Sequence, residues 1–177
     1  MNNKVILIAV GACVVLAGLV GWSLLAFFIV RSGILSSHGR THDASEYVIR
    51  FGIITNDSEG NSYVSQETTT IPMKYKNPSF QYGCEISPPD NQPYTCWCVV
   101  HFPTPPKMLT GDGFASSLPS TTVQTVKIEE RGKSAVSFGF DEGDPLGDQS
   151  IDVYINGQLA KTIRFTVVPA DDSGNGN

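Results

Sequence analysis

The hydrophobic pattern divides the chain into two unlike parts. Residues 5–30 form a run of 26 residues without one charged side chain, and 22 of them are apolar. In a bilayer core every backbone N–H and C=O needs a partner within its own segment, so such a run folds as a helix. At about 1.5 Å per residue it reaches about 39 Å, enough to cross a hydrocarbon core of about 30 Å with some tilt. The pattern therefore predicts a single transmembrane anchor over residues 1–31.

A cleaved signal peptide is the competing interpretation of this segment. The apolar region of such a peptide is about 7–15 residues long and is followed by small residues. The run here is longer and ends on the bulky residues Phe27, Phe28, Ile29 and Val30. The sequence therefore favours an anchor that is retained.

One face of the predicted helix carries small residues at helical spacing. These residues are Ala9, Cys13, Ala17, Gly18 and Gly21. Small side chains let a second helix approach closely in lipid, where dispersion then drives association. We therefore expect helix–helix packing with other membrane-protein subunits along this face.

After residue 45 the pattern changes to short runs of β-branched and aromatic residues, several of them alternating with polar ones. Turn residues separate eight such runs: Glu46–Thr55, Ser62–Ile71, Ser79–Ser87, Tyr94–Phe102, Thr121–Glu129, Ser134–Phe140, Ser150–Ile155 and Leu159–Val168. Short strands at this spacing are typical of a β-sandwich or barrel. We expect an all-β, immunoglobulin-like β-sandwich of about 7–8 strands behind the single transmembrane helix.

The last two runs predict a hairpin around Asn156-Gly157. The apolar residues on both sides of this turn are odd-numbered, among them Ile151 before it and Ile163 after it. A two-residue turn alone would pair odd with even positions and place the two apolar rows on opposite faces. A three-residue or bulged turn pairs odd with odd, so we expect one of these.

Composition sets the limits of the aqueous part. Residues 32–45 are rich in Ser and Gly and predict a flexible tether, and residues 170–177 predict a disordered acidic tail. Residues 46–169 remain for the β-sandwich domain, which is long enough for one hydrophobic core. The net charge of −5 lies entirely outside the apolar run, and an acidic balance argues against a nucleic-acid partner.

Three cysteines lie close together in the predicted domain. Cys96 and Cys98 share one face of their strand, and Cys84 precedes a proline-rich stretch that we interpret as a hairpin loop. Cys84 could therefore face Cys96 or Cys98 and form a disulfide, while buried free thiols are the other interpretation. A metal site at Cys96, Cys98 and His101 is disfavoured, because strand alternation turns His101 away from both thiols.

The positive-inside rule does not decide how the predicted anchor is oriented in the membrane, because Lys4 flanks one end and Arg31 and Arg40 flank the other. The cysteines must therefore decide the orientation. A disulfide would suit an oxidising compartment. We expect the amino terminus inside and the domain outside the membrane.

The order of several short motifs resembles an uncharacterised bacterial family of small β proteins. The motifs are Phe51-Gly52, Thr69-Thr70-Ile71-Pro72, Tyr82-Gly83, residues 99–106 (VVHFPTPP), Phe138-Gly139-Phe140-Asp141 and residues 165–168 (FTVV). They cover about residues 46–169. The resemblance implies an immunoglobulin-like fold and a bacterial source, and it carries no catalytic residues. With a bacterial source, we expect the anchor in the inner membrane and the domain in the periplasm.

No catalytic motif stands out, so we expect a protein that is not an enzyme and has no cofactor. The sequence predicts an accessory or structural subunit of a larger membrane complex that presents its domain for protein–protein contacts. The alternatives are a periplasmic ligand-binding or sensing module, or a Cys/His metal or redox protein.

Overall fold

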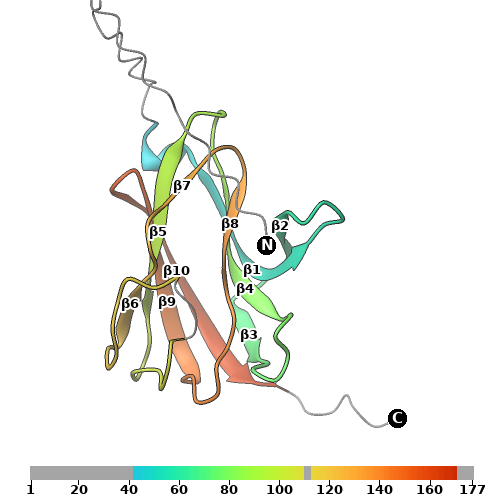
Figure 1. Ribbon diagram of the computed structural model, residues 1–177, viewed down its shortest axis with the longest axis vertical. Coiled ribbons are helices and arrows are strands. Elements are labelled where there is room, and N and C mark those ends of the chain that lie inside the picture. The colour runs from blue at the N-terminus through green and yellow to red at the C-terminus, as the bar shows by residue number, and fades with distance from the viewer. Residues whose placement is uncertain (1–41, 110–112, 171–177) are drawn as a thin grey trace, which may run out of the picture. The chain divides into compact units, whose positions relative to one another are not determined.

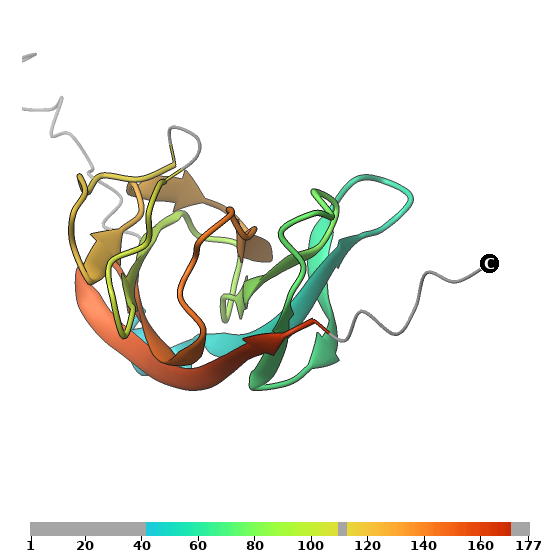
Figure 2. The same ribbon diagram turned by 90° about the horizontal axis from the view of Figure 1, so that it is seen from below.

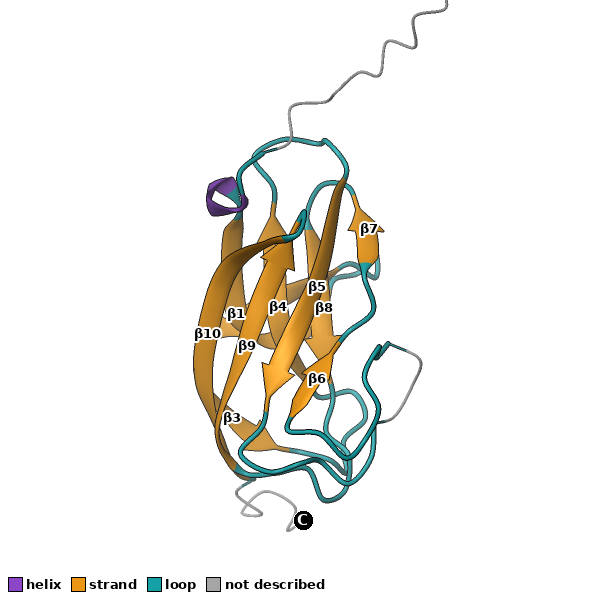
Figure 3. Cartoon of the chain, turned by 90° about the vertical axis from the view of Figure 1, so that its left-hand side faces the viewer, coloured by secondary structure: helices purple, strands orange, loops and turns teal. Residues whose placement is uncertain are grey.

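The computed structural model describes residues 42–109 and 113–170, which form a β-sandwich of two sheets (Figures 1 and 3). The four-stranded sheet has the order β2-β1-β4-β8, with β1 at Val48–Asn56, β2 at Ser62–Glu67, β4 at Gln81–Ser87 and β8 at Ser134–Phe138. The six-stranded sheet has the order β3-β10-β9-β5-β6, with β3 at Thr70–Met73, β5 at Tyr94–His101, β6 at Thr122–Gln124, β9 at Gly147–Ile155 and β10 at Gln158–Pro169. A sixth strand, β7 at Ile128–Glu130, also pairs with β5. The all-β sandwich expected from the sequence is confirmed.

The core lies between the sheets and is filled by the inward residues of each strand. In β9 the buried apolar residues are Ile151, Val153 and Ile155, as the alternation predicts. Aromatic rings from both sheets meet at one end of this core, where the ring centroid of Phe165 lies 5.0 Å from Phe51 and 5.7 Å from Tyr82. Contacts of this kind add to the burial of apolar area that holds the two layers together.

The expected count of about 7–8 strands is too low, because two of the eight apolar runs each form two strands. The run Ser62–Ile71 contains β2 and the start of β3, and the chain crosses from one sheet to the other between Glu67 and Thr70. The run Thr121–Glu129 contains β6 and the start of β7, and it breaks where the Thr125 hydroxyl accepts the Cys98 N–H at 2.9 Å.

The final hairpin confirms the expected pairing of odd with odd residues. The turn itself is two residues long, with both Asn156 and Gly157 at positive φ. A bulge at Ala160, between Leu159 and Lys161, then shifts the register, so that Ile163 pairs with Ile151. The extra residue needed to place both apolar rows in the core therefore lies in the strand and not in the turn.

The two lateral sides of the sandwich differ. On one side the chain passes directly from β2 to β3 and joins the two sheets, and β10 curves along the domain toward this side (Figure 2). On the other side lie β8, at the edge of its sheet, and β6 and β7, at the edge of theirs. Among the described residues no strand links the two sheets on this open side.

The described residues begin inside the stretch that the sequence assigns to the tether. A short 3-10 helix at Ala44–Glu46 is capped by Asp43, and Ala44 is buried against the sandwich. Nothing in the described part of the chain is a helix long and apolar enough to cross a membrane. The predicted anchor, with its packing residues Ala9, Cys13, Ala17, Gly18 and Gly21, lies outside the described residues, as do residues 32–41 and 171–177.

Candidate functional site

The three cysteines of the domain are buried free thiols. The hairpin that we expected between Cys84 and Cys96 is wrong, because β4 and β5 belong to different sheets. The thiols of Cys84 and Cys98 are instead hydrogen-bonded to each other across the core, and this contact, with burial, raises the pKa of Cys98. Burial also raises the pKa of Cys96, to about 12. At neutral pH the thiols of Cys96 and Cys98 are therefore protonated and poorly nucleophilic.

The residues of the disfavoured metal site are not brought together. Cys96 and Cys98 point into the core, while His101 lies on the outer face of β5 and contacts Asp152 through Nε2 at 2.9 Å. No group of three metal-ligating side chains occurs in the described part of the chain.

His101 belongs to a chain of polar contacts on the outer face of the six-stranded sheet. Asp152 accepts a hydrogen bond from Thr162 at 2.6 Å, and the other ring nitrogen of His101 lies 3.4 Å from the Thr122 hydroxyl. Burial pushes the pKa of Asp152 up, but the bonds from Thr162 and His101 outweigh it and leave that pKa below its usual value. The contact between His101 and the Thr122 hydroxyl is longer than the distance of about 2.6–3.2 Å that joins a base to a nucleophile. We therefore interpret these contacts as structural: they hold the side chains of this sheet face in place.

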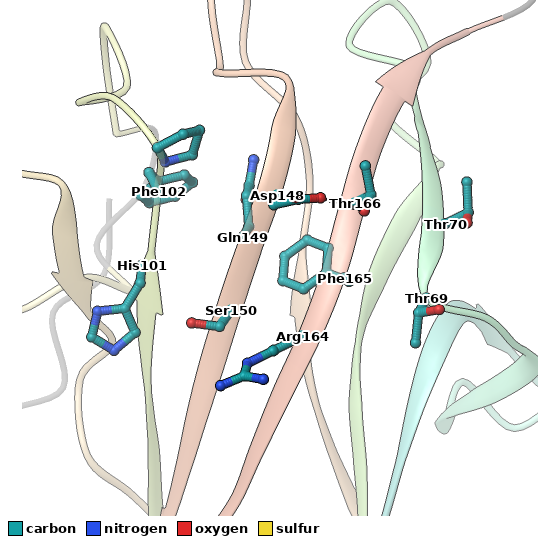
Figure 4. A pocket seen from close by; sticks show the side chains of 11 residues that line it. Thr69, Thr70, His101, Phe102, Asp148, Gln149, Ser150, Arg164, Phe165 and Thr166 are labelled. Carbon is teal, nitrogen blue, oxygen red and sulfur yellow. Dashed lines mark hydrogen bonds between the residues drawn. The ribbon is translucent and has the colours of Figure 1, made fainter.

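An open groove with a cavity volume of about 570 Å³ lies beside this chain of contacts, at the end of the sheet nearest β3 (Figure 4). His101, Ser150 and Arg164 stand in one row across β5, β9 and β10, because His101 pairs with Ser150 and Ser150 pairs with Arg164. The next row joins Asp148 and Thr166, whose hydroxyl donates to the carboxylate at 2.7 Å. We call this feature the polar groove; its lining also includes Thr69, Thr70, Phe102, Pro103, Gln149 and Phe165.

A second groove, of about 340 Å³, lies on the open side of the sandwich between the two sheets. One wall is β8, which has no neighbour on its outer edge within the described residues, and the other wall runs along residues 113–128. Its side chains are mainly apolar and include Phe114, Val126, Ile128 and Val136. We call this feature the edge groove.

Neither groove was predicted from the sequence. The alternation of apolar and polar residues in the sequence does indicate that Ser150 and Arg164 point outward from their strands. Their meeting depends on the register of three strands that lie far apart in sequence, which alternation does not give.

The similarity of this chain to curated proteins and to solved structures is low. A search of curated proteins finds no match. Among solved structures, an immunoglobulin-like protein from Pseudomonas aeruginosa is 15% identical, with a TM-score of 0.45 over 73% of this chain and 100% of that one. The alkylpurine DNA glycosylase AlkC of Pseudomonas fluorescens, bound to DNA with an abasic site analogue, is 10% identical, with a TM-score of 0.28 over 70% of this chain and 30% of that one. With scores this low, neither neighbour bears on what this chain does.

A family model gives a firmer assignment. The model of the PM0630 beta sandwich domain matches residues 49–168, from the second residue of β1 to the last residue but one of β10. That match spans both sheets and includes the cysteines and both grooves. The chain therefore belongs to the PM0630 beta sandwich domain family.

Proposed function

We propose that this chain is a non-enzymatic accessory subunit of a larger bacterial membrane complex. Its amino-terminal segment crosses the inner membrane once, and its β-sandwich lies in the periplasm and contacts partner proteins. The observation that carries the contact role is the edge groove, where the outer edge of β8 has no neighbouring strand among the described residues and lies beside an apolar surface.

The edge groove suits a partner polypeptide in an extended conformation. The outer edge of β8 offers backbone N–H and C=O groups to an added strand, which is a common way for sheets to bind peptides. The wall opposite β8 contains Phe114 and Ile128, half-buried residues that pack against the core cluster. A partner strand with apolar side chains at alternate positions would place them against this wall.

The sequence supports the membrane part of the proposal. The uncharged run at residues 5–30 is long enough to cross a bilayer, and its small residues suit packing against another helix. A subunit held by such a helix meets its partners both in the membrane and through its domain. The Cys/His metal alternative is less well supported, since His101 and the thiols lie on opposite faces of β5.

Co-purification of the full chain from its native membrane in mild detergent tests this proposal. We expect a stoichiometric protein partner. Val126→Asp, which places a charge in the edge groove, should release that partner, because Val126 is exposed there. Leu159→Asp is the matched control, since Leu159 is exposed at the β9–β10 hairpin, outside this groove. A chain that purifies alone, or a partner that both variants retain, would overturn the proposal.

A further inference from the structure

A row of large side chains crosses the outer face of the six-stranded sheet. Trp97 on β5 pairs with Tyr154 on β9, and Tyr154 pairs with Leu159 on β10. The half-buried rings of Trp97 and Tyr154 are stacked, with 5.1 Å between their centroids and 2° between their planes, and Leu159 is 53% exposed. The Lys127 ammonium lies over the Trp97 ring, 4.5 Å from its centroid. We call these four residues the aromatic row.

The stacking limits what the aromatic row can bind. Tyr154 covers one face of the Trp97 ring and Lys127 covers the other, because β9 and β7 lie on opposite sides of β5. A nucleic-acid base or a sugar ring needs an open aromatic face to stack on, and Trp97 offers none. The row therefore presents ring edges and the Leu159 side chain, which together form an apolar surface with polar tips at the indole N–H and the phenol hydroxyl.

Such a surface suits the interface of a lipid bilayer. Trp and Tyr are enriched at membrane–water interfaces, because their rings are apolar and their polar tips stay at the headgroup level. Within the described residues, neither the Trp97 N–H nor the Tyr154 hydroxyl has a hydrogen-bond partner. The outward charges beside the row are those of Lys127 and Glu129, and they offset each other. Apolar contact, and not attraction to anionic lipid, would therefore hold this surface on a membrane.

The aromatic row lies at the end of the domain where the chain enters it. The Ala44 N–H donates to the Gln158 side chain at 3.3 Å, so η1 lies beside the β9–β10 hairpin that carries Leu159 (Figure 3). The chain from Arg31, where the predicted anchor ends, to His42 spans at most about 40 Å. A short tether gives the row an effective concentration on the order of millimolar at the bilayer, so weak contacts suffice.

We propose that the aromatic row lies on the bilayer surface and holds this end of the domain against it. Leu159 and the ring edges reach the boundary between headgroups and acyl chains, and the Lys127 ammonium stays among the headgroups. The inference rests on the membrane anchor of the proposed function and does not involve contacts in the edge groove. With this face on the membrane, the edge groove opens sideways, toward proteins in the same bilayer.

Tryptophan fluorescence of the full chain, reconstituted into phosphatidylcholine vesicles, tests this contact. The chain has two tryptophans, so Trp22→Phe leaves Trp97 as the only one. Lipids brominated on their acyl chains near the headgroups quench a tryptophan that touches them, and we expect them to quench Trp97. Adding Leu159→Asp should abolish this quenching and make Trp97 more accessible to acrylamide in the water, because a carboxylate is costly to bury in the contact.

Val48→Asp is the matched control, since Val48 is 61% exposed directly after η1 but belongs to the other sheet. It should leave the quenching unchanged. The inference is overturned if bromination does not change Trp97 fluorescence, which would leave the row to a protein partner, or if Leu159→Asp and Val48→Asp are quenched alike. A chain that alkaline carbonate washes off the vesicles has no anchor, which overturns this inference and the proposed function together. A carbonate-resistant chain without quenching overturns the inference alone.

Discussion

Cys84 and Cys98 meet in the middle of the core, each from a different sheet, with their thiols hydrogen-bonded. Oxidation would therefore join the two sheets directly, whereas the described residues offer Cys96 no second thiol from the other sheet. In an oxidising compartment we expect a Cys84–Cys98 disulfide, its electrons passing to a thiol–disulfide exchange catalyst. The bond closes a loop of about 15 residues, so its reduction should lower the free energy of unfolding by about 3 kcal/mol.

Thiol counting on the denatured, unreduced full chain measures this. Two of the four cysteines, Cys13 and Cys96, should react when the protein comes from an oxidising compartment. Cys96→Ala should leave one reactive thiol, and Cys84→Ala should leave three. Four reactive thiols in the wild type, or a peptide that links Cys84 to Cys96, would contradict the assignment.

The pairing of Cys84 with Cys98 shows where sequence reasoning stops. Alternation correctly places Cys96 and Cys98 inward and His101 outward, because it is a local property of one strand. The sheet to which a strand belongs is not local. The proline-rich stretch after β4 resembles a hairpin loop in sequence, yet it carries the chain from one sheet to the other.

The same limit applies to the strand count and the grooves. The run at residues 62–71 contains no Gly, Pro, Asn or Asp to mark the crossing from β2 to β3, so its sequence pattern alone indicates one strand. The polar groove joins His101, Ser150 and Arg164 through pairings with β9, which depend on register. The odd-to-odd pairing of the last hairpin was predictable, because burial of both apolar rows allows no other register.

Glu85 is a buried carboxylate under β2, and we expect its charge to stabilise the domain. It is 1% exposed, accepts the Val64 N–H at 2.9 Å, and lies 3.0 Å from the Lys133 ammonium. Burial pushes the pKa of Glu85 up, but these two contacts outweigh it and leave the pKa below its usual value. Glu85→Gln should therefore cost about 1–3 kcal/mol at pH 7, measured by urea unfolding.

The cost of Glu85→Gln should depend on pH. A lowered pKa in the folded state stabilises the fold above the unfolded value of about 4.3, and this is lost as the pH falls through the folded pKa. The difference between wild type and Glu85→Gln should thus shrink in acid. Glu67→Gln is the control, since Glu67 pairs with Arg50 on the exposed surface and should cost at most about 1 kcal/mol. An equal cost for both variants would contradict a special role for Glu85.

Gly83 allows the close approach of β4 and β8. A Cβ atom built there would overlap the backbone carbonyl oxygen of Val136, and a backbone atom cannot move aside as a flexible side chain can. Gly83→Ala should therefore cost about 3 kcal/mol or prevent folding, as seen by thermal unfolding. At Gly139 an added Cβ meets nothing within 4 Å, so Gly139→Ala should change stability by less than about 0.5 kcal/mol. If both substitutions were tolerated equally, the strands would have to lie further apart.

His42 ties the start of the domain to the loop after β4, and this tie should weaken as the pH rises. Its Nε2 lies 2.8 Å from Asp90 and its Nδ1 lies 3.0 Å from Glu46. The hydrogen bond to Asp90, followed by that to Glu46, raises the pKa of His42 above 6.5. A raised pKa in the folded state stabilises the fold below pH 6.5, and this is lost as the pH rises through the folded pKa.

The melting temperature of the full chain at pH 5.5, 6.5 and 8 measures the effect. His42→Gln should melt below the wild type at pH 5.5 and approach it at pH 8, because the wild-type imidazole is then neutral. Asp90→Asn removes the main partner and should reduce the same pH dependence, while the double variant should add little to either single one, since both act on one contact. Parallel melting curves for wild type and His42→Gln at all three pH values would show that the protonated imidazole does not hold residues 42–46 against the sandwich.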